Sequence, residues 1–344
     1  MTRNDMAEAG KSPAHDALTG YGNGTGVDLS ICIPYYDEID YLCHCLRSLP
    51  FPIPGYRCEI IVIDDASDEP CAERIRTEFP NVRVIENKAN MGFAAAMNRA
   101  VRASTGRYLL LLNSDTKVLD GLPEVIAFLE ESPDVGAAGP RVLNPDGSFQ
   151  PQCRRGRLTP ASAFGYVTRL DRRFPTGKLG EYLERWRSEL EQQDVAALSG
   201  ACMIVRRDVF ESMGGFDETF IMYGEDLDLC YRIGEVGRRV VYFPRANVIH
   251  AGGCGGTRRR YYRSRLLFWR GAWMVLTRDR STRGATASDW LLGIAASMGF
   301  LGSCLVSPFR FLGVGVRKSV SELAPEAWPR VVPTLSPGNS EADS

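Results

Sequence analysis

Runs of apolar residues alternate with amphipathic stretches through the first 135 residues. Four runs are short and almost continuously apolar, as buried strands are, and the stretches between them carry apolar residues at helical spacing. The expected strands are 29–34, 58–64, 82–87 and 108–113, and the expected helices are 38–49, 70–79, 93–104 and 122–131. Such alternation is typical of an α/β fold with a mixed, mostly parallel sheet that is flanked by helices.

The pattern changes after Asp134. Residues 135–149 carry hairpin and turn signals around the sequence NPDG, and 152–193 are rich in arginine and aromatic residues but show little periodicity. A buried strand is expected again within 195–210, then a loop and a helix within 214–237, and a last strand at 239–250. A basic and aromatic segment follows from Arg258.

An apolar segment lies near the end of the chain. Trp290–Phe309 are twenty residues without a charge, the length of a bilayer span, but glycine, serine and proline dilute the segment. Its apolar residues recur at helical spacing and Arg310, Arg317 and Lys318 flank its far end, which suits a helix lying on an anionic inner leaflet. A helix that packs on the protein itself or in a homodimer is the alternative.

The composition indicates which partners the protein does not attract and which cellular compartment it favours. Lys plus Arg (41) nearly balance Asp plus Glu (42), so no overall charge would attract nucleic acid. Ten cysteines are scattered without a CxxC pair, which favours a reducing compartment over a disulfide framework. Residues 1–27 are polar and glycine-rich, which predicts a disordered tail and no signal peptide. We therefore expect a cytoplasmic protein.

Acidic residues stand where predicted strands end or where a helix begins. Asp64 and Asp65 follow one strand, Asp115 follows another, and Glu225 and Asp226 open the helix within 214–237. The first two sets share the ligand-binding edge if the sheet is parallel. Carboxylates grouped in this way suit a divalent cation with a diphosphate, because Mg²⁺ and Mn²⁺ take oxygen ligands.

His250 ends the last predicted strand. It is either a structural residue or a further ligand of such a cation.

Two other classes of protein fit this arrangement of acidic residues and strands less well. In a receiver domain of a two-component system the acidic pair follows the first strand, whereas here a strand precedes it. A dinucleotide-binding fold is excluded because no GxGxxG follows any predicted strand.

Six motifs together resemble the family 2 glycosyltransferases of the GT-A fold, in particular a rhamnosyltransferase-like subgroup. They are SICIPYYDEIDYLCHCLRSL, EIIVIDDASDE, NMGFAAAMNRAV, YLLLLNSDTKV, LSGACMIVRRDVFESMGGFDETFIMYGEDLDLCYRI and VIHAGG, and they stand in the family's order between about residues 29 and 256. The resemblance implies that the nucleotide-sugar donor is bound by Pro34, Tyr36, Asp37, Asp64, Asp65, Asn90, Gly92, Asn98, Asn113 and Gly200. The family more often has asparagine at the position of Asp37.

The resemblance also implies the chemistry. NSD corresponds to the family's DxD motif with Asn113 at its first position, so Asp115 and His250 would bind Mn²⁺ or Mg²⁺, which neutralises the departing diphosphate. GEDLDL resembles the ED motif, in which one carboxylate is the general base of an inverting displacement. Asp226 is the first choice for that base and Glu225 the second, while Asp228 and Arg232 are expected to form a structural pair at i,i+4.

From composition and pattern we expect a disordered tail (1–27), an apolar, membrane-associated helical segment (281–320) and a flexible tail (321–344). The resemblance implies a nucleotide-sugar-binding half (28–135) and an acceptor-binding half of the same domain (136–280). It implies an enzyme on the cytoplasmic face of the inner membrane that extends a lipid-linked or polysaccharide acceptor in cell-surface glycan synthesis, with rhamnose as the favoured sugar. An inactive nucleotide-sugar-binding or glycan-binding protein on the same scaffold is the alternative. Arg154, Arg155 and Arg157 would read an anionic ligand or form a solvated basic loop.

Overall fold

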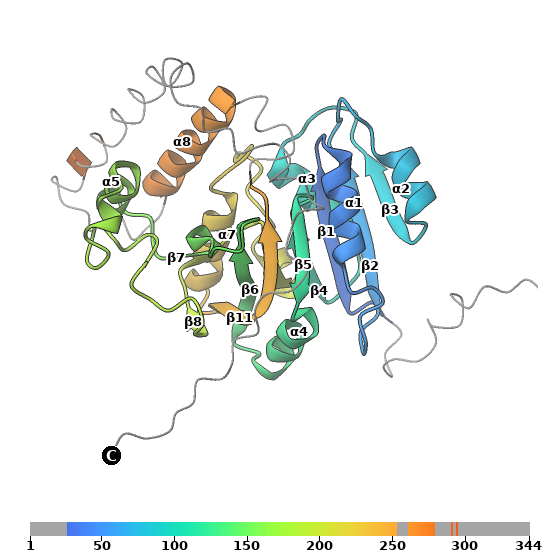
Figure 1. Ribbon diagram of the computed structural model, residues 1–344, viewed down its shortest axis with the longest axis horizontal. Coiled ribbons are helices and arrows are strands. Elements are labelled where there is room, and N and C mark those ends of the chain that lie inside the picture. Colours follow the sequence, from blue (N-terminus) through green and yellow to red (C-terminus); the bar gives the residue numbers. More distant parts are fainter. Residues whose placement is uncertain (1–25, 253–260, 279–289, 292–293, 295–344) are drawn as a thin grey trace, which may run out of the picture.

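The computed structural model describes residues 26–252, 261–278, 290–291 and 294. Within them, a nine-stranded sheet has the order β3-β2-β1-β4-β10-β6-β11-β5, and β8 pairs with β11 (Figure 1). Its strands are β1 (Leu29–Tyr35), β2 (Cys58–Asp64), β3 (Val82–Glu86), β4 (Tyr108–Leu112), β5 (Thr116–Asp120), β6 (Val135–Leu143), β8 (Gln193–Asp194), β10 (Cys202–Arg206) and β11 (Arg239–His250). A second small sheet pairs β7 (Arg154–Arg155) with β9 (Ala197–Leu198).

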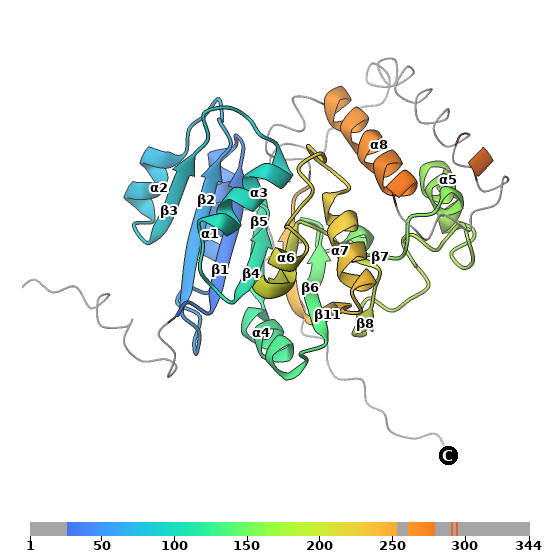
Figure 2. The ribbon, with the colours of Figure 1, turned by 180° about the vertical axis from the view of Figure 1, so that it is seen from behind.

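Helices cover both faces of the main sheet. They are α1 (Ile39–Ser48), α2 (Ala72–Glu78), α3 (Phe93–Arg102), α4 (Leu122–Glu131), α5 (Pro160–Thr168), α6 (Arg207–Ser212), α7 (Glu225–Glu235) and α8 (Tyr261–Arg278), with short 3-10 turns at Pro151–Cys153 and Leu170–Arg172. One core lies under α1, α2 and α4, and the other under α3, α6 and α7, so the sheet is buried from both sides (Figure 2).

β4 shows why the apolar runs predict strands correctly. All five of its residues are buried, and alternation sends Leu110 and Leu112 into the core under α1 while Leu109 and Leu111 enter the core under α3. A strand with two buried faces has no place for a polar residue until it leaves the sheet. The polar sequence Asn113–Ser114–Asp115 therefore lies at the edge of the sheet.

Strand direction brings the site segments to one edge. β1 is parallel to β2 and β4, β2 to β3, and β6 to β11. β10, β5 and β8 are antiparallel to their neighbours, so six of the nine strands run in one direction and the expected mixed, mostly parallel sheet is confirmed. Because β10 runs in the opposite direction, Gly200 and Ala201 precede it at the edge where β1, β2 and β4 end.

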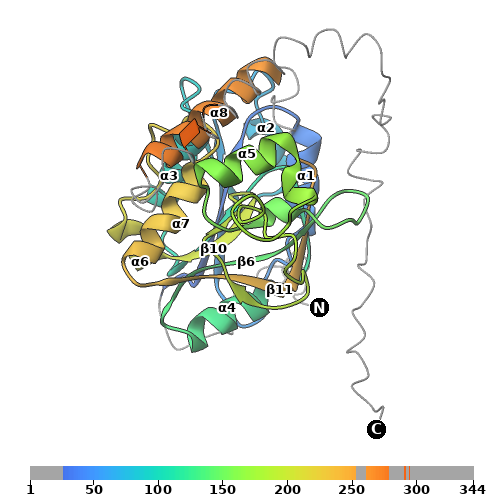
Figure 3. The same cartoon turned by 90° about the vertical axis from the view of Figure 1, so that its left-hand side faces the viewer.

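α8 crosses the end of the molecule that holds α5 and the start of α7 (Figure 3). Of the helices that the structure describes, none has both the length and the apolarity needed to cross a bilayer. The expected tails (1–27 and 321–344) and the apolar segment 290–309 lie outside the described residues, apart from 26–27, 290–291 and 294. The membrane-associated segment 281–320 stays a prediction.

Candidate active site

The turn after β1 is held together by Asp37. This residue has a φ of 59° and is buried, and its Oδ1 accepts hydrogen bonds from the backbone N–H groups of Asp68 (2.9 Å) and Glu69 (3.2 Å). The carboxylate thus stabilises the loop after β2, because its oxygen accepts these two hydrogen bonds. Pro34 and Tyr36, on either side of buried Tyr35, are half-buried at the same edge.

The carboxylates of Asp64 and Asp65 also accept hydrogen bonds from other groups of the protein. Asp64 accepts from the backbone N–H groups of Ser67 (2.9 Å) and Cys71 (3.0 Å). Asp65 accepts from the Asn87 amide (2.6 Å) and from the backbone N–H groups of Met91 (2.9 Å) and Gly92 (2.9 Å). Asp65 therefore fixes the 87–92 loop, whose exposed residue Asn90 lies at the sheet edge.

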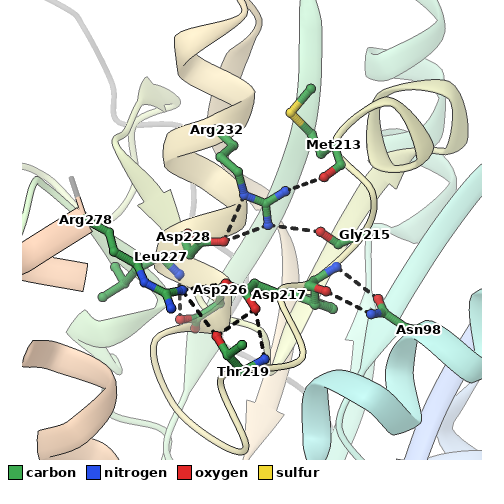
Figure 4. Close-up of polar contacts among 11 residues, drawn as sticks. Asn98, Met213, Gly215, Asp217, Thr219, Asp226, Leu227, Asp228, Arg232 and Arg278 are labelled. Carbon is green, nitrogen blue, oxygen red and sulfur yellow. Dashed lines mark hydrogen bonds and ion pairs between the residues drawn. The ribbon is translucent and has the colours of Figure 1, made fainter. Parts of the chain in front are cut away.

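Gly92 and Asn98 join α3 to the loop before α7. Gly92 has a φ of 86°, and a Cβ there would come within 2.6 Å of the Ile221 carbonyl oxygen. The Asn98 side chain donates to the Phe216 carbonyl (2.9 Å) and accepts from the Phe216 N–H (2.9 Å) (Figure 4). Both residues thereby position the 214–224 loop, which leads directly to Glu225.

Asn113, Asp115 and His250 lie together at the sheet edge. β11 pairs with β5 so that His250 is opposite Thr116, and its Nε2 lies 3.3 Å from Asp115 Oδ1 and 3.3 Å from the Asn113 amide nitrogen. Asn113 Oδ1 is buried and has no hydrogen-bond partner. Among the described residues no three His, Cys, Asp or Glu side chains gather as a metal site, so a cation bound here would need a further donor, such as the Asn113 oxygen.

Gln150 orients the His250 ring. Its Oε1 lies 2.9 Å from His250 Nδ1, and its Nε2 donates to Asn144 Oδ1 (3.0 Å). Because Oε1 can only accept, Nδ1 carries a proton, and Nε2 is the ring nitrogen that faces Asp115 and Asn113. One carboxylate, one imidazole and one amide oxygen are a donor set that fits Mn²⁺ or Mg²⁺ when phosphate oxygens complete it. The residues therefore fit the expected ion.

Two consecutive residues connect this donor set to α7. The Asn113 N–H donates to the Ala201 carbonyl (2.9 Å), and the Gly200 N–H donates to Asp226 Oδ2 (2.9 Å). A Cβ on Gly200 would meet the Asp226 side chain at 3.5 Å. Burial, followed by the charges of Glu225 and Asp115, raises the pKa of Tyr223, so this tyrosine lies within the electrostatic reach of both carboxylates. The two acidic sets thus belong to one region.

Both carboxylate oxygens of Asp226 accept hydrogen bonds from the protein. Its Oδ2 accepts from Arg155 Nη2 (2.7 Å) as well as from Gly200, and its Oδ1 accepts from the Leu227 N–H (2.8 Å). The Arg155 guanidinium also donates to the Leu198 carbonyl (2.6 Å). Hydrogen bonds from an arginine and two backbone amides thus occupy both oxygens of this carboxylate.

Glu225 is in the opposite situation. It is 6% exposed, and its Oε2 has no hydrogen-bond partner. Burial, followed by the charge of Asp226, raises the pKa of Glu225 to about 8. Since a free buried carboxylate oxygen and a raised proton affinity are what a general base needs near neutral pH, the geometry favours Glu225 over Asp226 for that role.

The other charged residues of this region are structural. Arg232 donates to Asp228 (2.8 Å) and to the Met213 and Gly215 carbonyls, which confirms the expected i,i+4 pair (Figure 4). Arg154 is buried and donates to the Glu184 and Arg187 carbonyls. The expectation of a solvated basic loop is therefore wrong for Arg154 and Arg155, because both guanidinium groups are desolvated and hydrogen-bonded.

Sequence patterns missed three parts of this region. Gln150 follows a turn and gives no signal of its own, and the partner of Arg155 lies 71 residues away. The third part is an aromatic pocket beside Glu225, to which Tyr166, Tyr182 and Phe268 contribute. The enrichment of 152–193 in arginine and aromatic residues was the available signal, but it does not indicate which of these residues face the site.

Comparisons with known proteins place these features in a family. The model described as Glycosyl transferase family 2 matches residues 30–214, and that of Glycosyl transferase family group 2 matches residues 185–325. The chain is 31% identical over 206 residues to an N-acetylglucosaminyl-diphospho-decaprenol L-rhamnosyltransferase from Mycobacterium tuberculosis, which covers 56% of this chain and 66% of that protein. It is 29% identical over 232 residues to the O-antigen biosynthesis protein RfbC from Myxococcus xanthus, covering 64% of this chain and 17% of that protein.

The matches thus span just under two thirds of the first relative and a small part of the second. Among solved structures, the mannosyltransferase PcManGT from Pyrobaculum calidifontis, in complex with GDP-Man and Mn²⁺, is similar with a TM-score of 0.51 at 15% identity. That similarity covers 88% of this chain and 85% of the mannosyltransferase and concerns the fold.

Proposed function

Since the chain belongs to glycosyl transferase family 2 and has the GT-A fold, we propose that it is an inverting transferase that moves a sugar from a nucleoside diphosphate to a hydroxyl group of an acceptor. The acceptor oxygen bonds to the anomeric carbon, the bond from that carbon to the diphosphate breaks, and the hydroxyl proton passes to a carboxylate. One observation carries the proposal: residues 200–201 connect the Asn113–Asp115–His250 set to the Glu225–Asp226 pair.

The two carboxylates of the pair have different roles in this proposal. Glu225 takes the proton from the attacking hydroxyl, because its Oε2 is free and its pKa is raised to about 8. Asp226 is paired with Arg155, and its charge adds to burial in raising the pKa of Glu225. This reverses the order in which the sequence resemblance ranks the two residues.

Asn113, Asp115 and His250 would hold Mn²⁺ or Mg²⁺, with Gln150 fixing the ring of His250. When bound, the ion supplies positive charge that neutralises the diphosphate leaving group. The buried, unpartnered Oδ1 of Asn113 supports this assignment, since such an oxygen is expensive to bury without a ligand.

The donor nucleotide would lie along the ends of β1, β2 and β4. Pro34, Tyr36, Asn90 and Gly200 are the residues proposed to contact it. Asp37, Asp64, Asp65, Gly92 and Asn98 would shape its binding site through the loops that they stabilise. Rhamnose is the proposed sugar, because the mycobacterial relative is an L-rhamnosyltransferase.

The proposed acceptor is a lipid-linked or polysaccharide glycan, and the proposed location is the cytoplasmic face of the inner membrane. The names of the mycobacterial and myxobacterial relatives support the acceptor class. Leu266 (55% exposed), Trp273 and Leu291 (66% exposed) support contact with a membrane surface, because large apolar side chains are exposed on the C-terminal helical residues.

A panel of dTDP-, UDP- and GDP-sugars tests the proposal on the full chain. One member should raise the melting temperature in the presence of Mn²⁺, because a ligand that binds only the folded state stabilises it. The same sugar nucleotide should release free nucleoside diphosphate slowly with Mn²⁺ and not with EDTA. Binding without any turnover would support the inactive binding protein, and absence of binding by the whole panel would contradict both.

A further inference from the structure

The two residues before Glu225 have an unusual backbone conformation. Tyr223 has a φ of 69° and Gly224 a φ of 94°, so the chain enters α7 through two consecutive residues of positive φ. Glycine adopts such a conformation freely, but a tyrosine does so only where the surrounding structure holds it. Because Tyr223 and Gly224 set the direction in which α7 begins, they also set the position of Glu225.

Helices α3, α7 and α8 hold the 214–224 loop, which contains both residues (Figure 4). Asn98 of α3 binds the backbone of Phe216, and Arg232 of α7 donates to the Gly215 carbonyl (2.9 Å). These contacts fix the first part of the loop. Its second part, which leads directly into α7, depends on α8.

Two arginines of α8 bind this second part. Arg278 pairs with Asp217, and the same carboxylate accepts from the Thr219 N–H (2.9 Å) (Figure 4). Arg270 donates to the Thr219 carbonyl (2.9 Å). The Arg278 guanidinium also lies over the ring of buried Phe220, 5.4 Å from its centroid. Side chains from separate turns of α8 thus hold the loop in place.

A glycine of α8 lies directly against Tyr223. A Cβ on Gly271 would come within 2.0 Å of the Tyr223 carbonyl oxygen, so only glycine allows this approach of the helix. The ring of Phe268 contacts that of Tyr223 edge-on, with 5.8 Å between the centroids. Since both the backbone and the ring of Tyr223 contact α8, the helix supports the positive φ of this residue.

α8 also shields Glu225 from water. Phe268, Trp269 and Ala272 line the same cavity as Glu225, which is 6% exposed. Burial is the first cause of the raised pKa of Glu225. A shift of α8 away from the loop would therefore change both the position of this carboxylate and its hydration.

We propose that Gly271 is a positioning residue of the active site: its lack of a side chain lets α8 pack against Tyr223, and α8 thereby fixes the start of α7 and the place of Glu225. Arg270 and Arg278 support the same contact. The inference rests on the proposed function, in which Glu225 accepts a proton, and assigns to α8 the placement of that acceptor. A displacement of about 1 Å can cost on the order of 100-fold in rate.

Gly271→Ala tests the inference on the full chain. We expect kcat to fall about 10- to 100-fold, with the KM for the sugar nucleotide nearly unchanged, because other segments form the donor site. The rising limb of the pH profile of kcat/KM should move to lower pH, since water that reaches Glu225 reduces the effect of burial on its pKa.

The pH profile separates positioning from a merely structural role, because the substitution adds one methyl group and changes no charge. The groups that face Glu225 are Asp226 and Asp228 of its own helix, Arg155 of β7 and Tyr223 of the loop, and the variant retains them all. A displaced limb would therefore report a change in the surroundings of Glu225, whereas a loss of stability alone would leave the limb in place.

Hydrogen exchange provides a readout that needs no turnover. The backbone amides of residues 217–224 should exchange about 10-fold faster in Gly271→Ala, because their loop has lost its support. Arg278→Met should accelerate the same amides about 2- to 5-fold, since its ion pair with Asp217 is partly exposed, and Arg278→Lys should recover part of the difference. Arg278→Met decides the question if Gly271→Ala does not fold.

Gly234→Ala is the matched control, because Gly234 lies within α7 and no atom lies within 4 Å of its Cβ position. Helix propensity alone would make both glycine substitutions neutral or stabilising. Binding of a nucleoside diphosphate with Mn²⁺ should be retained in every folded variant. Absence of turnover in the unmodified protein would contradict the proposed function, while the exchange rates would still test the contact.

The inference is overturned if the loop of Gly271→Ala exchanges as that of Gly234→Ala does. It is also overturned if Gly271→Ala retains the kcat and the pH profile of the unmodified protein.

Discussion

The guanidinium of Arg155 donates to Oδ2 of Asp226 over 2.7 Å, although 71 residues separate the two in the chain. Both side chains are nearly buried, with exposed fractions of 9% and 12%. The pair joins the small β7–β9 sheet to the first turn of α7, where acidic residues also favour the helix N-terminus. Arg155 thus binds Asp226, and Glu225 is the carboxylate of this helix start whose Oε2 has no hydrogen-bond partner.

This pair should be important for stability. Arg155→Met leaves the Asp226 carboxylate buried without its cation, and we expect the free energy of unfolding to fall by about 3–5 kcal/mol. The double variant Arg155→Met/Asp226→Leu should recover much of the loss. Urea denaturation at pH 7 measures both values, with Arg76→Met as the control, because the exposed Arg76–Glu86 pair should contribute about 1 kcal/mol or less. A change of that size in Arg155→Met would contradict the role assigned to the pair.

Glu225 should also make stability depend on pH. Its pKa is raised from an ordinary 4.5 to about 8, so between these values the folded state retains a proton that the unfolded state has released. The stabilisation is complete below pH 4.5 and is lost as the pH rises through 8. Glu225→Gln should remove this component, and chemical denaturation at pH 5, 7 and 9 should show a flatter decline than in the unmodified protein. An identical decline in both proteins would show that Glu225 does not titrate in this range.

The same group should govern the pH dependence of catalysis. We expect kcat/KM to rise with pH up to about 8, because the base must lose its proton before it can accept one from the acceptor. Asp226→Asn removes the negative charge beside Glu225 and frees the positive charge of Arg155, while the more distant Asp228 is unchanged. Both the loss of the Asp226 charge and the freed charge of Arg155 lower the pKa of Glu225. The rising limb of the pH profile of kcat/KM should therefore move to lower pH in this variant. A limb that stays in place would exclude Glu225 as its source.

Gln150 should affect metal binding through His250. Gln150→Leu leaves Nδ1 of His250 without its acceptor, and we expect the concentration of Mn²⁺ for half-maximal turnover to rise about 10- to 100-fold. Turnover at saturating Mn²⁺ should change much less. Gln150→Glu retains the acceptor and is the matched control. Equal Mn²⁺ requirements in Gln150→Leu and the unmodified protein would show that the contact does not orient a ligand.

Membrane contact has its own test. A chain without residues 288–344 should remain in the supernatant when mixed with anionic lipid vesicles and centrifuged, whereas the full chain should sediment with them, because the deletion removes the apolar segment and its basic flank. Neutral vesicles are the control for the charge contribution. Sedimentation of the shortened chain to the same extent would place the contact elsewhere, for example on the exposed face of α8.

Much of the sheet and its edge could be predicted from the sequence, because burial imposes a local pattern. The apolar run Tyr108–Leu112 forms β4, and the amphipathic pattern at Leu122–Glu131 forms α4 with the same bounds. Polar residues that interrupt such runs must lie at an edge, so the positions of Asp65, Asp115 and His250 follow from the strands that they end. β5, directly after Asp115, gave no separate signal because it is short and follows β4 without a helix between them.

Side-chain partners could not be predicted in the same way, because they depend on tertiary packing. Asp37 follows β1 and Asp64 ends β2, as donor-binding residues would, but their oxygens accept hydrogen bonds from the protein's own backbone. In the sequence, Arg155 cannot be told from the other arginines of its polar segment. In the structure, the pairing of β7 with β9 places it beside Asp226. The aromatic pocket assembles from segments as far apart as α5 and α8, which share no sequence periodicity.

The most direct test of the account compares Glu225→Gln with Asp226→Asn in a transfer assay that also follows the binding of the sugar nucleotide with Mn²⁺. We expect Glu225→Gln to lower kcat by about 10²- to 10⁴-fold with donor binding unchanged, because only the proton acceptor is lost. Asp226→Asn, measured at the optimum of its shifted pH profile, should retain more of the activity. Turnover by Glu225→Gln at the rate of the unmodified enzyme would contradict the account, and so would a larger loss in Asp226→Asn.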